Sequence, residues 1–394
     1  MSFQFNLARL PRVEFGPGQL SAVPGLVSRY GRRVLVVTGS HSFLASRHWT
    51  MLAAELRTRE IAWEIVQVDG EPSPDLVDRT VIGLAGKEFH CVLGIGGGSA
   101  LDAAKAIAGL LKPGNSVMDH LEGVGPELPY LGPATPFIAV PTTAGTGSEA
   151  TKNAVLSVHG EHGFKKSFRD EKLVAEYAVI DPDLLASCPP HVLAANGMDA
   201  VTQLLESYVS SKANPFTDAL ALSGMKQARD ALLPWYEGAG DASAHRAAMA
   251  YAALLSGITL AQVGLGSVHG LAAPLGAFFP IPHGVACGTL VAEATRVNLA
   301  ALEDRAPEHP ALRKYADVGR LLGDPGAADP AARANLLAIL EDWTQRLELP
   351  RLRAYGVGEA DVDRIVANSR GSSMKTNPIL LADAEIAEVI RARL

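Results

Sequence analysis

Three residues in the second half of the chain have side chains that could together bind a divalent metal ion. Asp199 lies in a segment that we expect to open a helix, where Gln203 would share its face one turn later. His269 and His283 each precede a glycine. One carboxylate and two imidazoles leave a coordination position for a substrate oxygen, as Lewis-acid catalysis requires. Each residue could instead be structural, for example as a hydrogen-bonded core histidine or a first-turn carboxylate.

A glycine-rich turn in the first half has the composition of a phosphate-binding site. Gly96, Gly97 and Gly98 follow an apolar run and precede an amphipathic segment. Glycines let the backbone approach a ligand closely, and the free N–H groups at a helix start attract a pyrophosphate. We expect Ser99 to cap this helix. A tight strand–helix turn without a ligand is the alternative.

A second polar loop runs from Pro141 to Glu149 and also follows a short apolar run. Its glycines and hydroxyl groups suit a ribose, a phosphate or a carboxamide. The hydroxyl groups belong to Thr142, Thr143, Thr146 and Ser148. Alone, this segment could equally be a flexible surface loop. Its occurrence downstream of the glycine turn favours cofactor binding.

The elements that must position these residues fall into two halves with different periodicity. Short apolar runs at 33–39, 63–68, 90–95, 137–140 and 178–180 alternate with helical patterns, which predicts a parallel sheet covered on both faces. Beyond Asp181-Pro182, long Ala/Leu-rich stretches have helical spacing instead. We therefore predict a Rossmann-like α/β nucleotide-binding domain over residues 1–188. An all-helical metal- and substrate-binding domain follows over residues 189–394.

The composition excludes several classes of partner. The formal net charge is −7, and no Lys/Arg run is dense enough to follow a phosphate backbone, so we expect no nucleic acid partner. No run of 18 apolar residues occurs, and the first residues do not resemble a signal peptide, so we expect no membrane span. Three scattered cysteines form no CxxC pair, which favours a reducing cytoplasm.

In type and order, these motifs resemble those of the iron-containing (group III) alcohol dehydrogenases over nearly the whole chain. The matching segments are Phe15-Gly16-Pro17-Gly18, Gly96 to Lys105 with Asp102, Pro141 to Glu149, Asp181-Pro182, Gly197 to Ala200, His269-Gly270, Pro282-His283-Gly284 and Asn377-Pro378. The resemblance implies an α/β domain and a helical domain, an architecture shared with dehydroquinate synthase. It also implies that Gly96 to Ser99 hold the pyrophosphate of NAD(P), and that Thr142, Thr143 and Lys165 line the remaining cofactor site.

The sequence departs from this family at two metal-site positions. The family usually binds its metal through one Asp and three His, and Asp199, His269 and His283 match three of these. Gln203 occupies the fourth position, and Ala273 replaces a further cleft histidine. An amide oxygen is a weaker ligand than imidazole. Three ligands still suffice, as in the similar glycerol dehydrogenases, and the choice between Fe²⁺ and Zn²⁺ stays open. Without the second histidine, proton transfer would run through water or the cofactor ribose.

The residues after the first strand bear on the choice between NAD and NADP. NAD-specific relatives often carry an acidic residue there, whereas this chain has Thr38, Gly39, Ser40 and His41. Without a carboxylate, nothing at these positions repels a 2′-phosphate, and hydroxyl groups could bind it. We therefore expect NADPH to be accepted.

We predict a metal-dependent NAD(P)-linked alcohol dehydrogenase or aldehyde reductase for small substrates, acting as a homodimer or larger homo-oligomer. One alternative is a metal-independent reductase similar to the maleylacetate reductases. A second is a lyase of the dehydroquinate-synthase type, although few Lys or Arg residues stand near the metal-site motifs. A third is a nucleotide-binding protein with a decayed site, suggested by Gln203 and Ala273.

Overall fold

The computed structural model describes residues 4–394 and divides the chain into two compact units. The first comprises Ala8–Val158 and Lys165–Cys188, and holds the sheet. The second comprises Pro189–Leu394, together with His159–Phe164 and the described chain up to Leu7. The segment His159–Phe164 belongs to the helical unit because Gly160 donates its N–H to the Ala277 carbonyl at 3.1 Å.

The first unit is built on one six-stranded sheet with the order β1-β8-β5-β4-β2-β3. Every pairing in it is parallel. The strands are β1 (Arg12–Phe15), β2 (Arg33–Gly39), β3 (Ala62–Val68), β4 (Cys91–Gly96), β5 (Phe137–Pro141) and β8 (Tyr177–Ile180). The helices are α1 (Val23–Ser28), α2 (Arg47–Thr58), α3 (Pro74–Gly83) and α4 (Gly98–Leu110), and β6 (Asn153–Val158) and β7 (Phe164–Arg169) form a separate two-stranded sheet. The predicted α/β fold class is confirmed.

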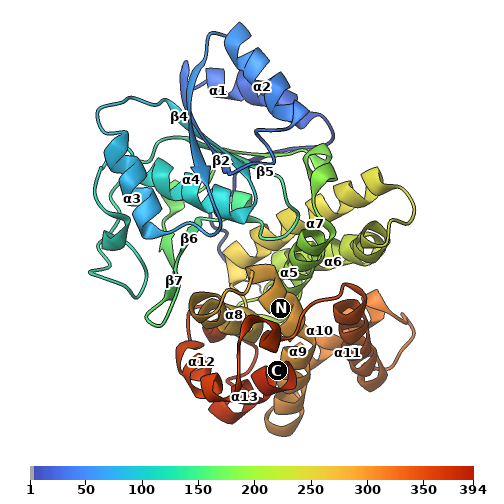
Figure 1. Cartoon of the computed structure of the whole chain (residues 1–394). Helices are drawn as coiled ribbons and strands as arrows, with labels where there is room; N and C mark the ends of the chain where they lie inside the picture. The colour runs from blue at the N-terminus through green and yellow to red at the C-terminus, as the bar shows by residue number, and fades with distance from the viewer. Residues whose placement is uncertain (1–3) are drawn as a thin grey trace. The chain divides into compact units, whose positions relative to one another are not determined.

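Alternation along the central strands divides the core between the two faces of the sheet. Val34 and Val36 of β2 join the apolar cluster that includes the buried side chains of α1 and α2. The intervening Leu35 and Val37 are also fully buried and face the other way. Helices α3 and α4 cover that second face, as Figure 1 shows. Burial on both faces explains why these strands are continuous apolar runs in the sequence.

The strand order reverses between β2 and β4, because β3 lies outside β2 whereas β5 and β8 continue on the far side of β4. In open parallel sheets, ligands bind beyond the carboxyl ends of the strands at such a reversal. Strands β2, β4 and β5 end at Gly39, Gly96 and Pro141. The fold therefore brings the glycine turn, the loop from Pro141 to Glu149 and the residues after Gly39 to one edge of the sheet.

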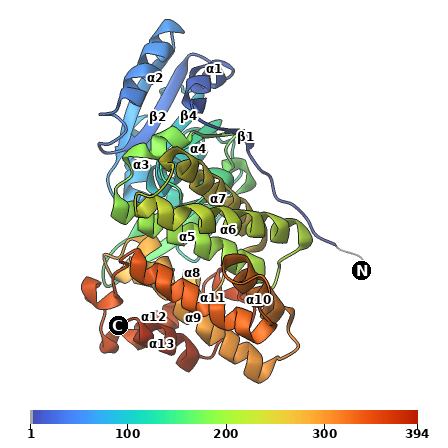
Figure 2. The ribbon, with the colours of Figure 1, turned by 90° about the vertical axis from the view of Figure 1, so that its right-hand side faces the viewer.

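Among the described residues, the second unit is helical apart from its loops and Phe164, the first residue of β7. Its helices are α5 (Pro190–Val209), α6 (Pro215–Tyr236), α7 (Ala242–Val263), α8 (Ser267–Phe278), α9 (His283–Arg305), α10 (Pro310–Leu322), α11 (Asp329–Arg346), α12 (Val362–Asn368) and α13 (Asp383–Ala392). Helices α5, α6 and α7 pack side by side (Figure 2). Two of these helices, α7 and α9, are long and apolar enough to span a membrane by composition. However, 61% and 83% of their most apolar windows are buried inside the fold, as in core helices.

Helix α5 begins earlier than the sequence pattern suggested. The expectation that the segment around Asn196 opens a helix is wrong, because α5 starts at Pro190 with proline at its first position. Asp199 therefore lies in the middle of a 20-residue helix rather than in its first turn. Gly197 is accommodated inside the helix because Leu232 packs against the place a Cβ would take.

Candidate metal centre and nucleotide site

Four side chains of the helical unit converge on one point. Asp199, His269, His283 and Cys287 each contribute one donor atom, and these atoms all lie within 4.8 Å of one another. The Nε2 atoms of His269 and His283 are 3.2 Å and 3.7 Å from Asp199 Oδ1. The structure thus brings together three of the four metal-ligand candidates predicted from the sequence, all but Gln203, and adds a thiol.

Three helices supply these groups. Asp199 projects from α5, His269 from the first turn of α8, and His283 and Cys287 from the first two turns of α9. Gly284 permits this convergence, since a Cβ there would lie 2.4 Å from the Ala195 carbonyl oxygen on α5. The histidine–glycine pairing at 283–284 is therefore a packing requirement that lets the start of α9 touch the α5 backbone.

Glu206 orients one imidazole of the cluster from behind. Its Oε2 lies 2.6 Å from His269 Nδ1, and its Oε1 accepts the Val268 N–H at 2.7 Å. A carboxylate on Nδ1 keeps a proton there, so Nε2, on the side of Asp199, is the nitrogen that a metal ion would bind. Residues 199, 203 and 206 follow the i, i+4, i+7 spacing of one helical face, and all three are buried. That spacing is the signal by which Glu206 could have been found in the sequence.

The electrostatics of the cluster suit a cation. Burial opposes charge on Asp199, but His283 and His269 outweigh it and hold the pKa of Asp199 below its usual value. Burial also favours a neutral His269, yet Cys287, Glu206 and Asp199 raise its pKa well above the usual value. Burial raises the pKa of the Cys287 thiol to about 12. In addition, Asp199 Oδ2 is buried without a hydrogen-bond partner among the described residues. The buried carboxylate of Asp199 with its unpaired oxygen, the imidazoles of His269 and His283, and the Cys287 thiol therefore fit a divalent metal ion.

The two residues that differ from the family pattern, Gln203 and Ala273, have different surroundings. Gln203 is buried on α5, and its Oε1 lies 2.7 Å from Ser256 Oγ, a residue of α7. That contact holds the amide in place, and its role as a metal ligand stays a prediction. Ala273 lies within α8, one turn after His269, and brings no titratable group to this position.

In the first unit, the glycine turn forms the start of α4. The N-cap is Gly97, and it makes no side-chain cap hydrogen bond, so the expectation that Ser99 caps the helix is wrong. Ser99 lies in the first turn because the helix already begins at Gly98. A Cβ at Gly98 would lie 2.8 Å from Thr146 Cγ2 and Oγ1, so only glycine allows the two loops to approach this closely. The N–H groups of Gly97, Gly98 and Ser99 are thus placed as an anion site would need.

A buried lysine holds the second polar loop against α4. Lys105 is fully buried and donates to Ser148 O and Oγ, to Thr151 Oγ1 and to the Asn153 carbonyl. Asp102, 3.6 Å from the same ammonium, accepts the Ser148 hydroxyl. Asp102 and Ser148 therefore fix the shape of the loop, while Thr142, Thr143 and Thr146 are its partly exposed hydroxyl residues. The loop is also linked to the glycine turn through Thr142 N and Gly96 O at 2.9 Å.

The residues beyond β2 differ in their access to a ligand. Thr38 is fully buried inside the sheet, so the structure does not bring its side chain to the surface with the others. Gly39 and Ser40 are partly exposed at the end of the strand. Ser40 Oγ lies 3.5 Å from Asp69 Oδ1, a carboxylate at the end of the neighbouring strand β3. Sequence reasoning missed Asp69, because it searched for an acidic residue after β2 only.

Lys165 lies on β7, and its ammonium is paired with Glu71 Oε1. Lys165 and the glycine turn belong to the same unit. The Lys165 ammonium, however, already donates a hydrogen bond to Glu71. A role at the cofactor would require Lys165 to share this charge with Glu71, and it stays a prediction.

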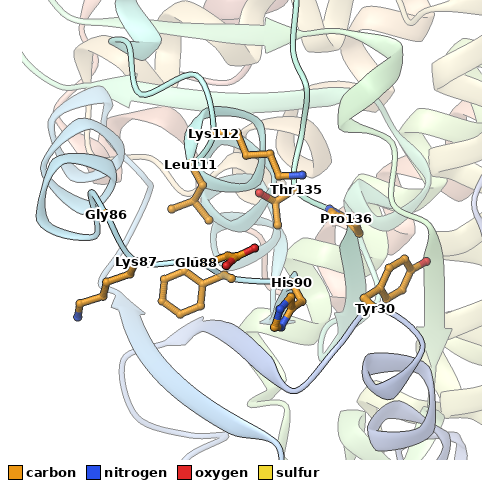
Figure 3. Close-up of a pocket in the computed structure, with 10 residues that line it drawn as sticks. Tyr30, Gly86, Lys87, Glu88, His90, Leu111, Lys112, Thr135 and Pro136 are labelled. Atoms are coloured by element: carbon orange, nitrogen blue, oxygen red, sulfur yellow. The ribbon is translucent and has the colours of Figure 1, made fainter.

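A hollow of about 570 Å³ lies at the opposite edge of the sheet (Figure 3). Its lining comes from the residues just before β4 and β5 and just after α4, and includes His90, Lys112 and Pro136. These are the amino ends of the strands, whereas the glycine turn follows the carboxyl end of β4. His90 accepts the Arg33 N–H through Nδ1, which is a structural role. This hollow is therefore separate from the nucleotide site.

The geometry agrees with comparisons to known proteins. Residues 11–182 match the family described as "Iron-containing alcohol dehydrogenase", and residues 193–394 match "Fe-containing alcohol dehydrogenase family, C-terminal". The chain belongs to the iron-containing alcohol dehydrogenases. Members of this family are oxidoreductases that act on CH–OH groups, and the chain is accordingly an NAD(P)-linked alcohol dehydrogenase with a divalent metal.

Individual relatives cover the whole chain. The NAD-dependent methanol dehydrogenase of Bacillus methanolicus is 29% identical over 394 residues, 98% of each chain. The NADPH-dependent butanol dehydrogenase of Clostridium saccharobutylicum is 27% identical over 388 residues, 96% of each chain. Among solved structures, a 1,3-propanediol oxidoreductase superposes over the full length of both chains with a TM-score of 0.89 and 28% identity.

Two family motifs far from the metal cluster have structural roles. Asp181 accepts the N–H groups of Gly18 and Leu20, which fixes the turn after β1 to the end of β8. Asn377 Oδ1 accepts the Ser267 N–H at the start of α8, two residues before His269. The Asn-Pro motif thus helps to fix the helix terminus that carries a candidate metal ligand.

Proposed function

We propose that this dehydrogenase interconverts short-chain primary alcohols and aldehydes at the cluster of Asp199, His269 and His283, with NAD(H) as its preferred cofactor. The observation that carries this proposal is the convergence of these buried donors, with Glu206 hydrogen-bonded behind His269. The relatives named above act on methanol, butanol and propanediol, which supports a short substrate.

In the oxidising direction, the alcohol loses a hydride to the nicotinamide and a proton to solvent, leaving a carbonyl and the reduced cofactor. A divalent cation at the cluster would polarise the substrate oxygen and stabilise the negative charge that develops on it. The protein's part is to keep the donors in position. Glu206 holds the proton on His269 Nδ1, and Asp199 supplies a negative charge that burial alone would disfavour.

The preference for NAD(H) rests on Asp69. Its carboxylate lies beside Ser40 at the edge of the sheet where the adenosine ribose binds in Rossmann-like folds. A carboxylate there accepts hydrogen bonds from a free ribose diol and repels a 2′-phosphate. This proposal replaces our expectation about NADPH, which relied on the absence of a carboxylate after β2.

The test begins with chelator-stripped protein. Oxidation of NADH and NADPH is followed with a panel of short aldehydes, without metal, with Zn²⁺, and anaerobically with Fe²⁺. We expect turnover only after metal addition. Turnover indifferent to metal would instead support a reductase of the metal-independent kind.

A histidine variant tests the assignment of the site. His283→Ala should abolish turnover and leave the dissociation constant of NADH nearly unchanged, because His283 and the glycine turn belong to different units. His245→Ala, at a partly exposed position in the first turns of α7, is the matched control. Loss of cofactor binding together with activity in His283→Ala would contradict the proposed role.

A further inference from the structure

Cys287 lies among the candidate metal ligands, although the resemblance to the family did not indicate a cysteine ligand. It follows His283 by four residues, so both side chains project from one face of α9. Its Sγ is 3.5 Å from His269 Nε2 and 3.7 Å from His283 Nε2. The residue is completely buried.

Four of the six distances between the donor atoms are close to the edges of a tetrahedral metal site. With Zn–N and Zn–O near 2.0–2.1 Å and Zn–S near 2.3 Å, neighbouring ligand atoms at tetrahedral angles are about 3.3–3.6 Å apart. The measured edges are 3.2 and 3.7 Å between Asp199 Oδ1 and the two imidazoles, and 3.5 and 3.7 Å from the thiol.

The other candidate for the fourth position already has a partner. The Gln203 Oε1 atom accepts a hydrogen bond from Ser256 Oγ, a residue of α7, at 2.7 Å. Cys287 has its Sγ against both imidazoles instead. An amide oxygen is also a much weaker ligand for zinc than a thiolate.

We propose that the thiolate of Cys287 is the fourth protein ligand of the metal, in place of the imidazole that α5 lacks at Gln203. This inference rests on the proposed function, because it concerns the same metal. A sulfur ligand favours Zn²⁺ over Fe²⁺, since thiolates are soft donors. The Asp/His/His/Cys set is thus a zinc site within an iron-named family. Binding of the ion displaces one proton from the Cys287 thiol to solvent and requires no oxidant.

The absorption spectrum of the cobalt-substituted protein detects a sulfur ligand directly. Stripped protein is titrated with Co²⁺ anaerobically, and its absorption spectrum is compared with those of Cys287→Ser and Cys91→Ser. The control is matched because Cys91 is also completely buried and free, but belongs to the sheet. We expect a thiolate-to-cobalt charge-transfer band in the near ultraviolet for the wild type and Cys91→Ser. Cys287→Ser should lose the band and bind Zn²⁺ at least ~10-fold more weakly.

A second measurement does not depend on the variant folding correctly. In zinc-loaded wild-type protein, X-ray absorption at the zinc K-edge should resolve one sulfur neighbour at about 2.3 Å among the nitrogen and oxygen ligands. One bound Co²⁺ without a charge-transfer band, or a zinc shell that contains no sulfur, would overturn the inference and leave the metal-dependent function standing. Failure to bind any metal, with turnover unaffected by chelator, would overturn both.

Discussion

Substituting Glu206 by glutamine removes one charge and reverses one hydrogen bond behind the metal cluster. The carboxylate now accepts from two donors, His269 Nδ1 and the Val268 N–H. An amide has one oxygen for these two donors. If its oxygen stays with Val268, its N–H₂ group faces Nδ1 and moves the imidazole proton to Nε2, where a metal would bind. If it turns around, a buried backbone N–H loses its partner, at about 1–3 kcal/mol.

Either outcome weakens metal binding. Carboxylates that orient ligating histidines contribute a factor of about 10–100 in metal affinity, which corresponds to about 1.4–2.7 kcal/mol. We therefore expect Glu206→Gln to bind Zn²⁺ about 10–100-fold more weakly in competition with a chromophoric chelator. Glu303→Gln is the control, because Glu303 is on α9 but pairs at the surface with Arg333. A Glu206→Gln variant within twofold of wild type would refute the orienting role.

Two further predictions concern the sheet unit. Asp69→Asn should raise kcat/KM for NADPH relative to NADH roughly tenfold, because it removes the carboxylate that would repel a 2′-phosphate. Asp75→Asn is the control. An unchanged ratio in Asp69→Asn would contradict the proposed cofactor preference. Burial raises the pKa of Glu149 from 4.5 to about 7. The folded unit therefore keeps a proton that the unfolded chain releases near pH 4.5, so stability falls by about 3 kcal/mol as the pH rises from 4.5 to 7. Urea unfolding of the sheet unit across this range should show that loss in the wild type and not in Glu149→Gln, and parallel pH curves for the two proteins would contradict it.

The architecture was the more predictable part of this protein. Parallel strands buried on both faces are continuous apolar runs, so β2 and β5 were identified nearly to the residue. Helix starts were less predictable: α5 begins at Pro190, whereas we expected a helix to open around Asn196. Proline at its first position was a usable signal. Strand β7 (Phe164–Arg169) was not predicted, because three of its six residues are Lys or Arg.

The site was predictable in its histidines and its aspartate, and less so in the residues around them. His269 and His283 are followed by glycine because neighbouring elements leave no room there for a side chain, and this leaves a recognisable motif. Cys287 and Glu206 are not part of such a motif. Their roles follow from helical spacing relative to His283 and Asp199, which becomes informative only once α5 and α9 are known to meet. Asp69 was missed because its neighbour Ser40 is a neighbour only across strands.

The distribution of the cluster over α5, α8 and α9 has a consequence for the durability of the fold. An ion bound there would cross-link helix segments up to 88 residues apart in sequence (199 to 287). It would act as a removable cross-link in a chain whose three cysteines form no disulfide. Ligand linkage gives about 2.7 kcal/mol of added stability at a free metal concentration 100 times the dissociation constant. Metal supply would then set not only how fast this protein works but how long its helical half survives heat and proteolysis.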